Sequence, residues 1–310
     1  MNLIKYISCL FILVLNAMYE GYAQTTIHIE TGETQSPLPF ATIINYSKKA
    51  IVFSDQLGNA TINFDNCDSI NISYVGYETL RLIFDKRHSA IYQLKQNKSL
   101  LNTVEIKACI PQKIFEYSNE EDNPQQKFGG LGWNFPSDNA KVAVMIKPDV
   151  KNAYAISFSF WLLNNIQAPK IAIQAPIKIS FYEIVDSTSL PGQLITNKLV
   201  VYFPKKQGKQ IIDLDSLRLK IPDNGMFIGI EYVLDEKYKY PVRYIDTKKG
   251  IDSTRYWYGA RFDGAVSNKF RMAFYYYFLD KWFYGGKRIK EEMEQPHGTI
   301  KCSLEIKYCE

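Results

Sequence analysis

The stretch from Thr25 to Ala108 decides the fold of the first domain of the chain. It contains PLPFAT (residues 37–42), DQLGN (residues 55–59) and SYVGYET (residues 73–79), in that order. Short strand-like runs are separated by turn signals, and Gly58 stands where a turn needs a positive φ. The predicted strands cover residues 26–30, 40–46, 60–64, 69–74, 79–84, 90–94 and 101–107. About seven short strands at this spacing predict a β-sandwich over residues 24–108.

The same stretch resembles the carboxypeptidase-regulatory-like domain, a transthyretin-like seven-stranded sandwich abundant in envelope proteins of Bacteroidetes. The resemblance covers about 84 residues, and the opening strand is abbreviated relative to the family. It is carried by PFATI (residues 39–43), SDQLG (residues 54–58), INISYVGYET (residues 70–79) and LNTVEI (residues 101–106). The resemblance implies a structural or interaction module without catalytic residues, often found at the N-terminus of TonB-dependent outer-membrane receptors.

The beginning of the chain indicates export. Lys5 precedes an apolar run from Ile7 to Leu15, and small residues lead to a cleavage site after Ala23, as in a secretory signal peptide. The run is shorter than the roughly 20 residues that span a bilayer. Cys9 lies early in the run, where a lipid anchor is not expected. We therefore predict a signal peptide over residues 1–23 and a protein of the periplasm or associated with the outer membrane.

Composition gives weaker constraints. The 310 residues include 37 Lys and Arg against 32 Asp and Glu, a net charge of +5, and no basic stripe favours nucleic acid as a partner. The 22 Tyr and 18 Phe residues suit strands. Four cysteines follow the signal peptide, and the sequence leaves their pairing open: Cys67, Cys109, Cys302 and Cys309.

A second sandwich follows a polar segment. Residues 109–130, with SNEEDNPQQ at 118–126, are predicted as a linker. Strand patterns then resume and predict a jelly-roll-like sandwich over residues 131–310. The predicted strands are 141–146, 155–163, 177–185, 198–203, 209–214, 225–234, 256–260, 271–278 and 299–308. This half resembles an uncharacterised sandwich of exported Bacteroidetes proteins, through IKISFYEIVD (177–186), SLPG (189–192), QIIDL (210–214) and IPDNGMFIGIEY (221–232).

The sequence lacks the motifs of several classes of enzyme and metal site. The histidines of the mature chain, His28, His88 and His297, stand in no HExxH or HxxE pattern, so a zinc carboxypeptidase site is not expected. Nucleophile-elbow, phosphate-loop and CxxC motifs are also absent. We expect no catalytic residue, metal or cofactor. The roughly 180 residues after the linker are too few for the plug and 22-stranded barrel of a receptor.

Aromatic residues near the C-terminus are the candidate ligand-binding residues. Alternate residues of a strand share a face, so Tyr275 and Tyr277 are predicted to point away from Phe274, Tyr276 and Phe278. Exposed flat rings suit stacking on sugars or contacts with proteins, and the alternative is that these rings pack the core. The candidates are Trp257, Tyr275, Tyr277, Trp282 and Tyr284.

These observations lead to an expected function with alternatives. The leading hypothesis is an exported, non-enzymatic envelope protein with two β-sandwiches that binds or scaffolds a glycan or another envelope protein. A second hypothesis is a glycan-active enzyme that uses paired carboxylates. The carboxylates on or near predicted strands are Asp213, Asp215, Glu231 and Asp235. A third is an accessory partner of a TonB-dependent transporter.

Overall fold

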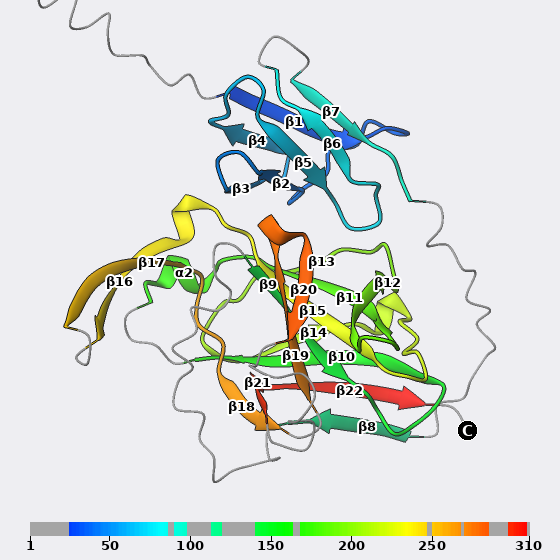
Figure 1. Cartoon of the computed structure of the whole chain (residues 1–310). Coiled ribbons are helices and arrows are strands. Elements are labelled where there is room, and N and C mark those ends of the chain that lie inside the picture. Colours follow the sequence, from blue (N-terminus) through cyan, green and yellow to red (C-terminus); the bar gives the residue numbers. More distant parts are fainter. Residues whose placement is uncertain are drawn as a thin grey trace, which may run out of the picture.

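The computed structural model describes residues 25–85, 90–97, 113–119, 140–163, 168–246, 250–267, 270–284 and 297–308. Strands are the main regular structure of these residues, which confirms the predicted all-β class (Figure 1). The helical elements among them are the short α2 (Lys170–Ile173) and the 3-10 turns η2 (Asp215–Leu217), η3 (Glu236–Tyr238) and η4 (Tyr277–Leu279). Over these ranges, no helix has the length and apolar character needed to cross a membrane. The predicted signal peptide and the predicted strand 101–107 lie outside the described residues.

The first unit is a sandwich of two small sheets. One sheet has the order β4-β1-β7 and the other the order β3-β2-β5-β6. Alternating apolar residues from both sheets, such as Ile29, Ile43 and Ile72, are fully buried between them. The strands are β1 (Thr25–Thr31), β2 (Thr42–Asn45), β3 (Ala50–Phe53), β4 (Asn59–Ile62), β5 (Ser69–Ser73), β6 (Leu80–Ile83) and β7 (Ile91–Leu94).

The second unit is a larger two-layer sandwich with two hairpins attached. A four-stranded sheet, β14-β10-β22-β8, packs on a seven-stranded sheet, β12-β11-β15-β9-β19-β20, in which β13 also pairs with β11. The hairpins are β16-β17 and β18-β21. The strands are β8 (Lys113–Ser118), β9 (Ala140–Ile146), β10 (Ala153–Leu162), β11 (Ile177–Val185), β12 (Leu190–Leu194), β13 (Val200–Tyr202), β14 (Gly208–Asp213), β15 (Met226–Tyr232), β16 (Lys239–Asp246), β17 (Ile251–Tyr258), β18 (Gly264–Ser267), β19 (Arg271–Tyr276), β20 (Lys281–Tyr284), β21 (His297–Ile300) and β22 (Cys302–Tyr308).

Some strands form where the sequence pattern gave no prediction. Strand β8 lies within the predicted linker 109–130 and pairs with β22 along its whole length. It is an edge strand whose Ile114 and Phe115 are exposed, so its sequence lacks the alternation of a half-buried strand. Strand β3 is also an edge strand, and its first three residues are only partly buried. The remaining unpredicted strands are β12, β16, β18 and β20.

Two of the four mature cysteines can be placed. Cys67 is exposed, Cys302 is buried, and both are free thiols. Burial raises the pKa of the Cys302 thiol far above its ordinary value, so Cys302 is a neutral core residue. Cys109 and Cys309 lie outside the described residues.

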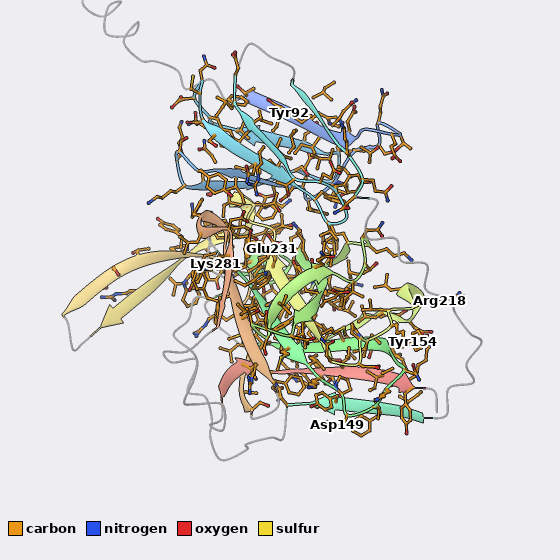
Figure 2. All side chains as sticks on the ribbon, turned by 45° about the vertical axis from the view of Figure 1, so that its right-hand side comes forward. Tyr92, Asp149, Tyr154, Arg218, Glu231 and Lys281 are labelled. Atoms are coloured by element: carbon orange, nitrogen blue, oxygen red, sulfur yellow. The ribbon has the colours of Figure 1, made fainter. Side chains whose placement is uncertain are left out.

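The two units pack sheet against sheet. The outward face of the β2-β5-β6 layer of the first unit lies over the seven-stranded sheet of the second unit (Figure 1). Glu231 lies near the middle of the molecule, where the units meet (Figure 2). Strand β15 is consequently buried at every position, because its own sandwich covers one face and the first unit helps to cover the other.

Candidate functional site

A row of polar and aromatic side chains crosses the seven-stranded sheet on the face turned toward the first unit. Lys178 of β11 is the cross-strand partner of Glu231 of β15. Lys141 of β9 is the partner of Tyr275 of β19, and Tyr275 is in turn the partner of Trp282 of β20. Neighbours of these residues along the strands point into the core, because side chains alternate between faces. Strands distant in sequence therefore bring these five residues into one row.

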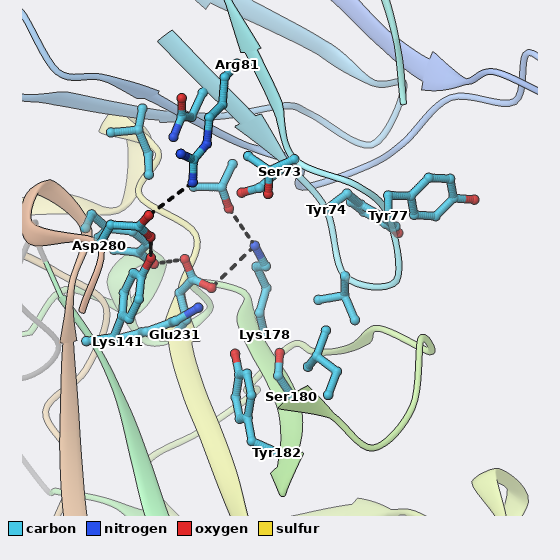
Figure 3. A pocket seen from close by; sticks show the side chains of 18 of the residues that line it. Ser73, Tyr74, Tyr77, Arg81, Lys141, Lys178, Ser180, Tyr182, Glu231 and Asp280 are labelled. Atoms are coloured by element: carbon cyan, nitrogen blue, oxygen red, sulfur yellow. Dashed lines mark hydrogen bonds and ion pairs between the residues drawn. The ribbon is translucent and has the colours of Figure 1, made fainter. Parts of the chain in front are cut away.

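Four residues of the row, all except Trp282, line the floor of a pocket between the two units. Figure 3 shows Lys141, Lys178 and Glu231 among them. The pocket has a volume of about 240 Å³, which is room for a small ligand or several water molecules. Its roof consists of outward-facing residues of the β2-β5-β6 layer, mostly polar, together with the loop after β5. The residues from the first unit are Thr42, Ile44, Tyr46, Asn71, Ser73, Tyr74, Val75, Tyr77, Thr79 and Arg81, and those from the second are Lys141, Lys178, Ser180, Tyr182, Leu194, Glu231, Tyr275, Tyr277 and Asp280.

Lys178 and Glu231 form a buried ion pair at one side of the pocket. The side chains are 5% and 10% exposed, with 3.4 Å between Lys178 Nζ and Glu231 Oε2. Lys178 Nζ also donates to the Phe40 carbonyl oxygen at 3.1 Å and to Thr42 Oγ1 at 3.0 Å. Burial lowers the pKa of Lys178, and Glu231 opposes that shift. Lys178 thus joins the two units while it neutralises Glu231.

A second charged pair lies at the mouth of the pocket and also joins the units. Arg81 Nη2 of the first unit lies 3.3 Å from Asp280 Oδ2 of the second. The Tyr275 hydroxyl donates to the other oxygen of Asp280. Burial and the Asp280 carboxylate raise the pKa of Tyr275 well above its usual range, so its hydroxyl keeps its proton. Both side chains of the Arg81–Asp280 pair are more than half exposed, so this pair is much weaker than a buried one.

Lys141 is half-buried among aromatic rings. Its Nζ lies 4.5 Å from the centre of the Tyr275 ring, 5.6 Å from those of Tyr182 and Trp282, and 6.0 Å from that of Tyr277. These distances are within the range of cation–π attraction. Burial lowers the pKa of Lys141, but attraction to Tyr182 and Glu231 outweighs it, and the pKa lies above its ordinary value. Lys141 is therefore a charged ammonium in the floor of the pocket.

Three of the candidate aromatic residues gather here. Tyr275 and Tyr277 line the pocket, with 5.7 Å between their ring centres. The Trp282 ring packs 5.2 Å from Tyr275. Tyr277 belongs to η4 rather than to the strand, and its hydroxyl donates to Glu231. The predicted separation of faces holds for Phe274, which lies in the core, and Tyr275, which does not.

The other two candidates lie elsewhere. Trp257 belongs to the β16-β17 hairpin, where its ring packs against Tyr240 at 6.2 Å, and it does not line the pocket. Its indole Nε1 and the Tyr240 hydroxyl are buried without a hydrogen-bond partner. Tyr284 ends β20 opposite Ala273, and its side chain is outside the described set. The structure thus does not bring Trp257 together with the aromatic residues of β19 and β20.

The candidate carboxylates are also spread over the molecule. Of the four, Glu231 alone lines the pocket. Asp213 and Asp215 lie at the end of β14 and in η2, and Asp215 forms an ion pair with Lys307. Asp235 pairs with Lys237. In the part of the chain that the structure describes, His, Cys, Asp and Glu form no cluster that could hold a metal ion.

Sequence reasoning missed the basic residues of the site. Lys141 and Lys178, like the candidate carboxylate Glu231, are single charges within otherwise apolar runs, AKVAVMI, IKISF and MFIGIEY. A charge at such a position faces away from the core of its own sandwich. That signal could have identified the face, although the sequence does not reveal that another unit covers it.

A larger pocket lies between the units around β3 and η3. It has a volume of about 990 Å³ and is lined by residues including Phe40, Ile51, Phe203, Leu234 and Tyr258. Its acids and bases are mostly exposed, as in the Asp235–Lys237 pair, whose side chains are 42% and 57% exposed. The smaller pocket is the better candidate site, because its charged groups are held in fixed, partly desolvated positions.

Comparisons with known proteins do not assign the chain to a family. No protein-family model matches the chain, and no curated protein matches its sequence. Among solved structures, the chain is similar to the cysteine protease and lectin-like domains of Cwp84, a surface-layer-associated protein of Clostridium difficile, with 11% identity and a TM-score of 0.30 over 55% of this chain and 32% of that one. Cwp84 after propeptide cleavage gives 9% identity and a TM-score of 0.30 over 84% of this chain and 48% of that one. The chain thus spans less than half of each of these structures, and the likeness is too distant to support a functional argument.

Proposed function

We propose that the protein is an exported, non-enzymatic glycan-binding protein of the cell envelope, and that the pocket between the two units holds the sugar. The predicted signal peptide supports export. The resemblance of residues 25–108 to the carboxypeptidase-regulatory-like domain supports a role for this unit as an interaction module. Here the module supplies the roof of the site rather than the whole of it.

The observation that carries the proposal is the set of polar groups fixed around the pocket. A buried ion pair is often no more stable than well-packed apolar residues of similar volume. Lys178 and Glu231 are nevertheless held in the contact between the units, next to Lys141. Such an arrangement adds little to stability and fits a binding role.

The pocket also has the composition that sugar binding needs. Hydroxyl and amide groups of Thr42, Asn71, Ser73 and Ser180 line it, and these groups can donate and accept hydrogen bonds to sugar hydroxyls. Tyrosine rings supply flat apolar surface for the faces of a sugar ring. A volume of about 240 Å³ suits a single small unit rather than a long chain.

The test is a glycan array followed by titration calorimetry with the best ligand. We expect Tyr275→Ala to weaken binding at least tenfold, because Tyr275 supplies both a ring and a hydroxyl to the pocket. Trp257→Ala is the matched control, since Trp257 packs in the β16-β17 hairpin, and it should leave binding unchanged. Binding that depends on Trp257 and not on Tyr275 would move the site to the hairpin. A pull-down that recovers an envelope protein through the same residues would favour a protein ligand.

A second candidate function, carboxylate-dependent glycan cleavage, rests on one specific observation. Glu231 and Asp280 both line the pocket, and glycosidases act with two carboxyl groups that flank the sugar bond. Each of these carboxylates already pairs with a cation and accepts a hydrogen bond from a tyrosine. Carboxylates that are already paired in this way are held in the ionised form, so the arrangement favours sugar binding over proton donation to a sugar bond. Release of free sugar by the wild type, lost in both Glu231→Gln and Asp280→Asn, would establish the enzyme instead.

A further inference from the structure

The charges around the pocket do not cancel. Three cations line it, Arg81, Lys141 and Lys178, together with two carboxylates, Glu231 and Asp280. Arg81 pairs with Asp280, and Lys178 pairs with Glu231. Among the residues that the structure describes, no carboxylate lies within ion-pair distance of Lys141. The residues that line the pocket therefore carry one more positive than negative charge, and Lys141 is the cation among them that forms no close ion pair, although Glu231 and Asp280 attract it from farther away.

The aromatic rings around Lys141 do not supply a close negative charge. The Tyr182 hydroxyl accepts a hydrogen bond from Lys141, and the surrounding rings attract the ammonium only through their faces. An ammonium has three donors, so capacity remains for an incoming anion. Lys141 also lies beside Tyr275, the residue best placed to contact a sugar ring.

We propose that the pocket binds a sugar that carries a single negative charge, as on a uronic acid, and that the anionic group pairs with Lys141. This inference rests on the proposed glycan-binding function and names its ligand class. A group with one charge matches the single excess positive charge of the pocket, whereas a phosphate monoester carries a charge of about −1.5 to −2 at neutral pH. The hydroxyls of Ser73 and Ser180, which also line the pocket, then face the neutral part of the sugar.

The test compares acidic and neutral sugars by titration calorimetry at constant ionic strength. The probes are glucuronate and galacturonate, their neutral counterparts glucose and galactose, glucose 6-sulfate and acetate. We expect at least one uronate to bind about tenfold or more tightly than its neutral counterpart. In a second series of titrations at higher salt, binding of the uronate should weaken and binding of the neutral sugar should stay unchanged. Glucose 6-sulfate distinguishes a sulfate from a carboxylate as the anionic group, and acetate shows whether the sugar ring is needed.

Variants of Lys141 assign the preference to this residue. Lys141→Gln should abolish the difference between acidic and neutral sugars, and Lys141→Arg should keep most of it. Lys147→Gln, which removes an exposed lysine that does not line the pocket, is the matched control and should change nothing. Circular dichroism checks folding. If Lys141→Gln does not fold, Lys141→Arg and the salt dependence still decide the question.

The outcomes separate this inference from the proposed function. Equal affinity for acidic and neutral sugars would overturn the inference and leave glycan binding intact. An acidic preference that survives in Lys141→Gln would also overturn it, because the anion would then bind elsewhere. If neither the array nor the titrations detect any sugar, the proposed function itself fails.

Discussion

The two faces of the seven-stranded sheet in the second unit are both covered, yet they are built differently. On the inner face, residues such as Phe181, Ile228 and Phe274 are apolar and pack against the four-stranded sheet. On the outer face, the same strands carry Lys178, Glu231 and other polar residues under the first unit. The inner face forms the apolar core of the sandwich, whereas the outer face also holds fixed charged groups that are suited to binding.

The strongest expected contrast comes from removing a core ring. Phe181→Ala takes away a fully buried side chain of the inner face and should lower the free energy of unfolding by about 3–5 kcal/mol. Urea denaturation followed by fluorescence measures this effect. Tyr275→Ala on the outer face is the comparison, and a stability loss as large as that of Phe181→Ala would remove the distinction between the faces.

Removing one partner of the buried ion pair should lower the free energy of unfolding almost as much. Lys178→Ala leaves Glu231 buried without its cation, which should destabilise the protein by about 3 kcal/mol. The double variant Lys178→Met with Glu231→Leu removes both charges and should recover most of that loss. If the double variant is as unstable as the single one, packing rather than charge dominates this position.

A glycine tests how tightly the units fit together. Gly76 has φ +83°, and an added Cβ would lie 2.3 Å from the Cβ of Asn197 in the other unit. Gly76→Ala should therefore destabilise the protein by about 2 kcal/mol and weaken ligand binding, because the neighbouring Tyr74 and Tyr77 line the pocket. Gly208→Ala is the matched control, since Gly208 has φ +89° but no atom within 4 Å of the added Cβ. Equal effects of the two variants on binding would show that the contact with Asn197 does not shape the pocket.

The smallest stability effect is expected at the mouth of the pocket. The Arg81–Asp280 pair joins the units, but its side chains are 69% and 51% exposed. Arg81→Ala should lower the free energy of unfolding by less than about 1 kcal/mol, as measured by urea denaturation at low salt. A loss above about 2 kcal/mol would mean that the mouth of the pocket contributes to holding the units together.

Much of the fold was predictable, because alternation reports which face of a strand is buried. Strand β11 has the predicted bounds, and Phe274 and Tyr275 separate as expected. Edge strands such as β3 and β8 were missed, since exposed faces weaken the alternation. The site was predicted only in part. The sequence indicates Tyr275 and Tyr277 as aromatic candidates. The place of Lys141 and Lys178 in the site follows only from the sheet order, in which β9 and β11 flank β15.

We propose that the pocket on the outer face of the sheet binds the ligand. The most direct measurement is a crystal structure of the protein soaked with the tightest-binding sugar from the array. We predict density for the sugar between Tyr275 and the β2-β5-β6 layer, within reach of Lys141. Density in the larger pocket around β3 or against Trp257 of the β16-β17 hairpin, with no sugar at Lys141, would show that the ligand binds elsewhere.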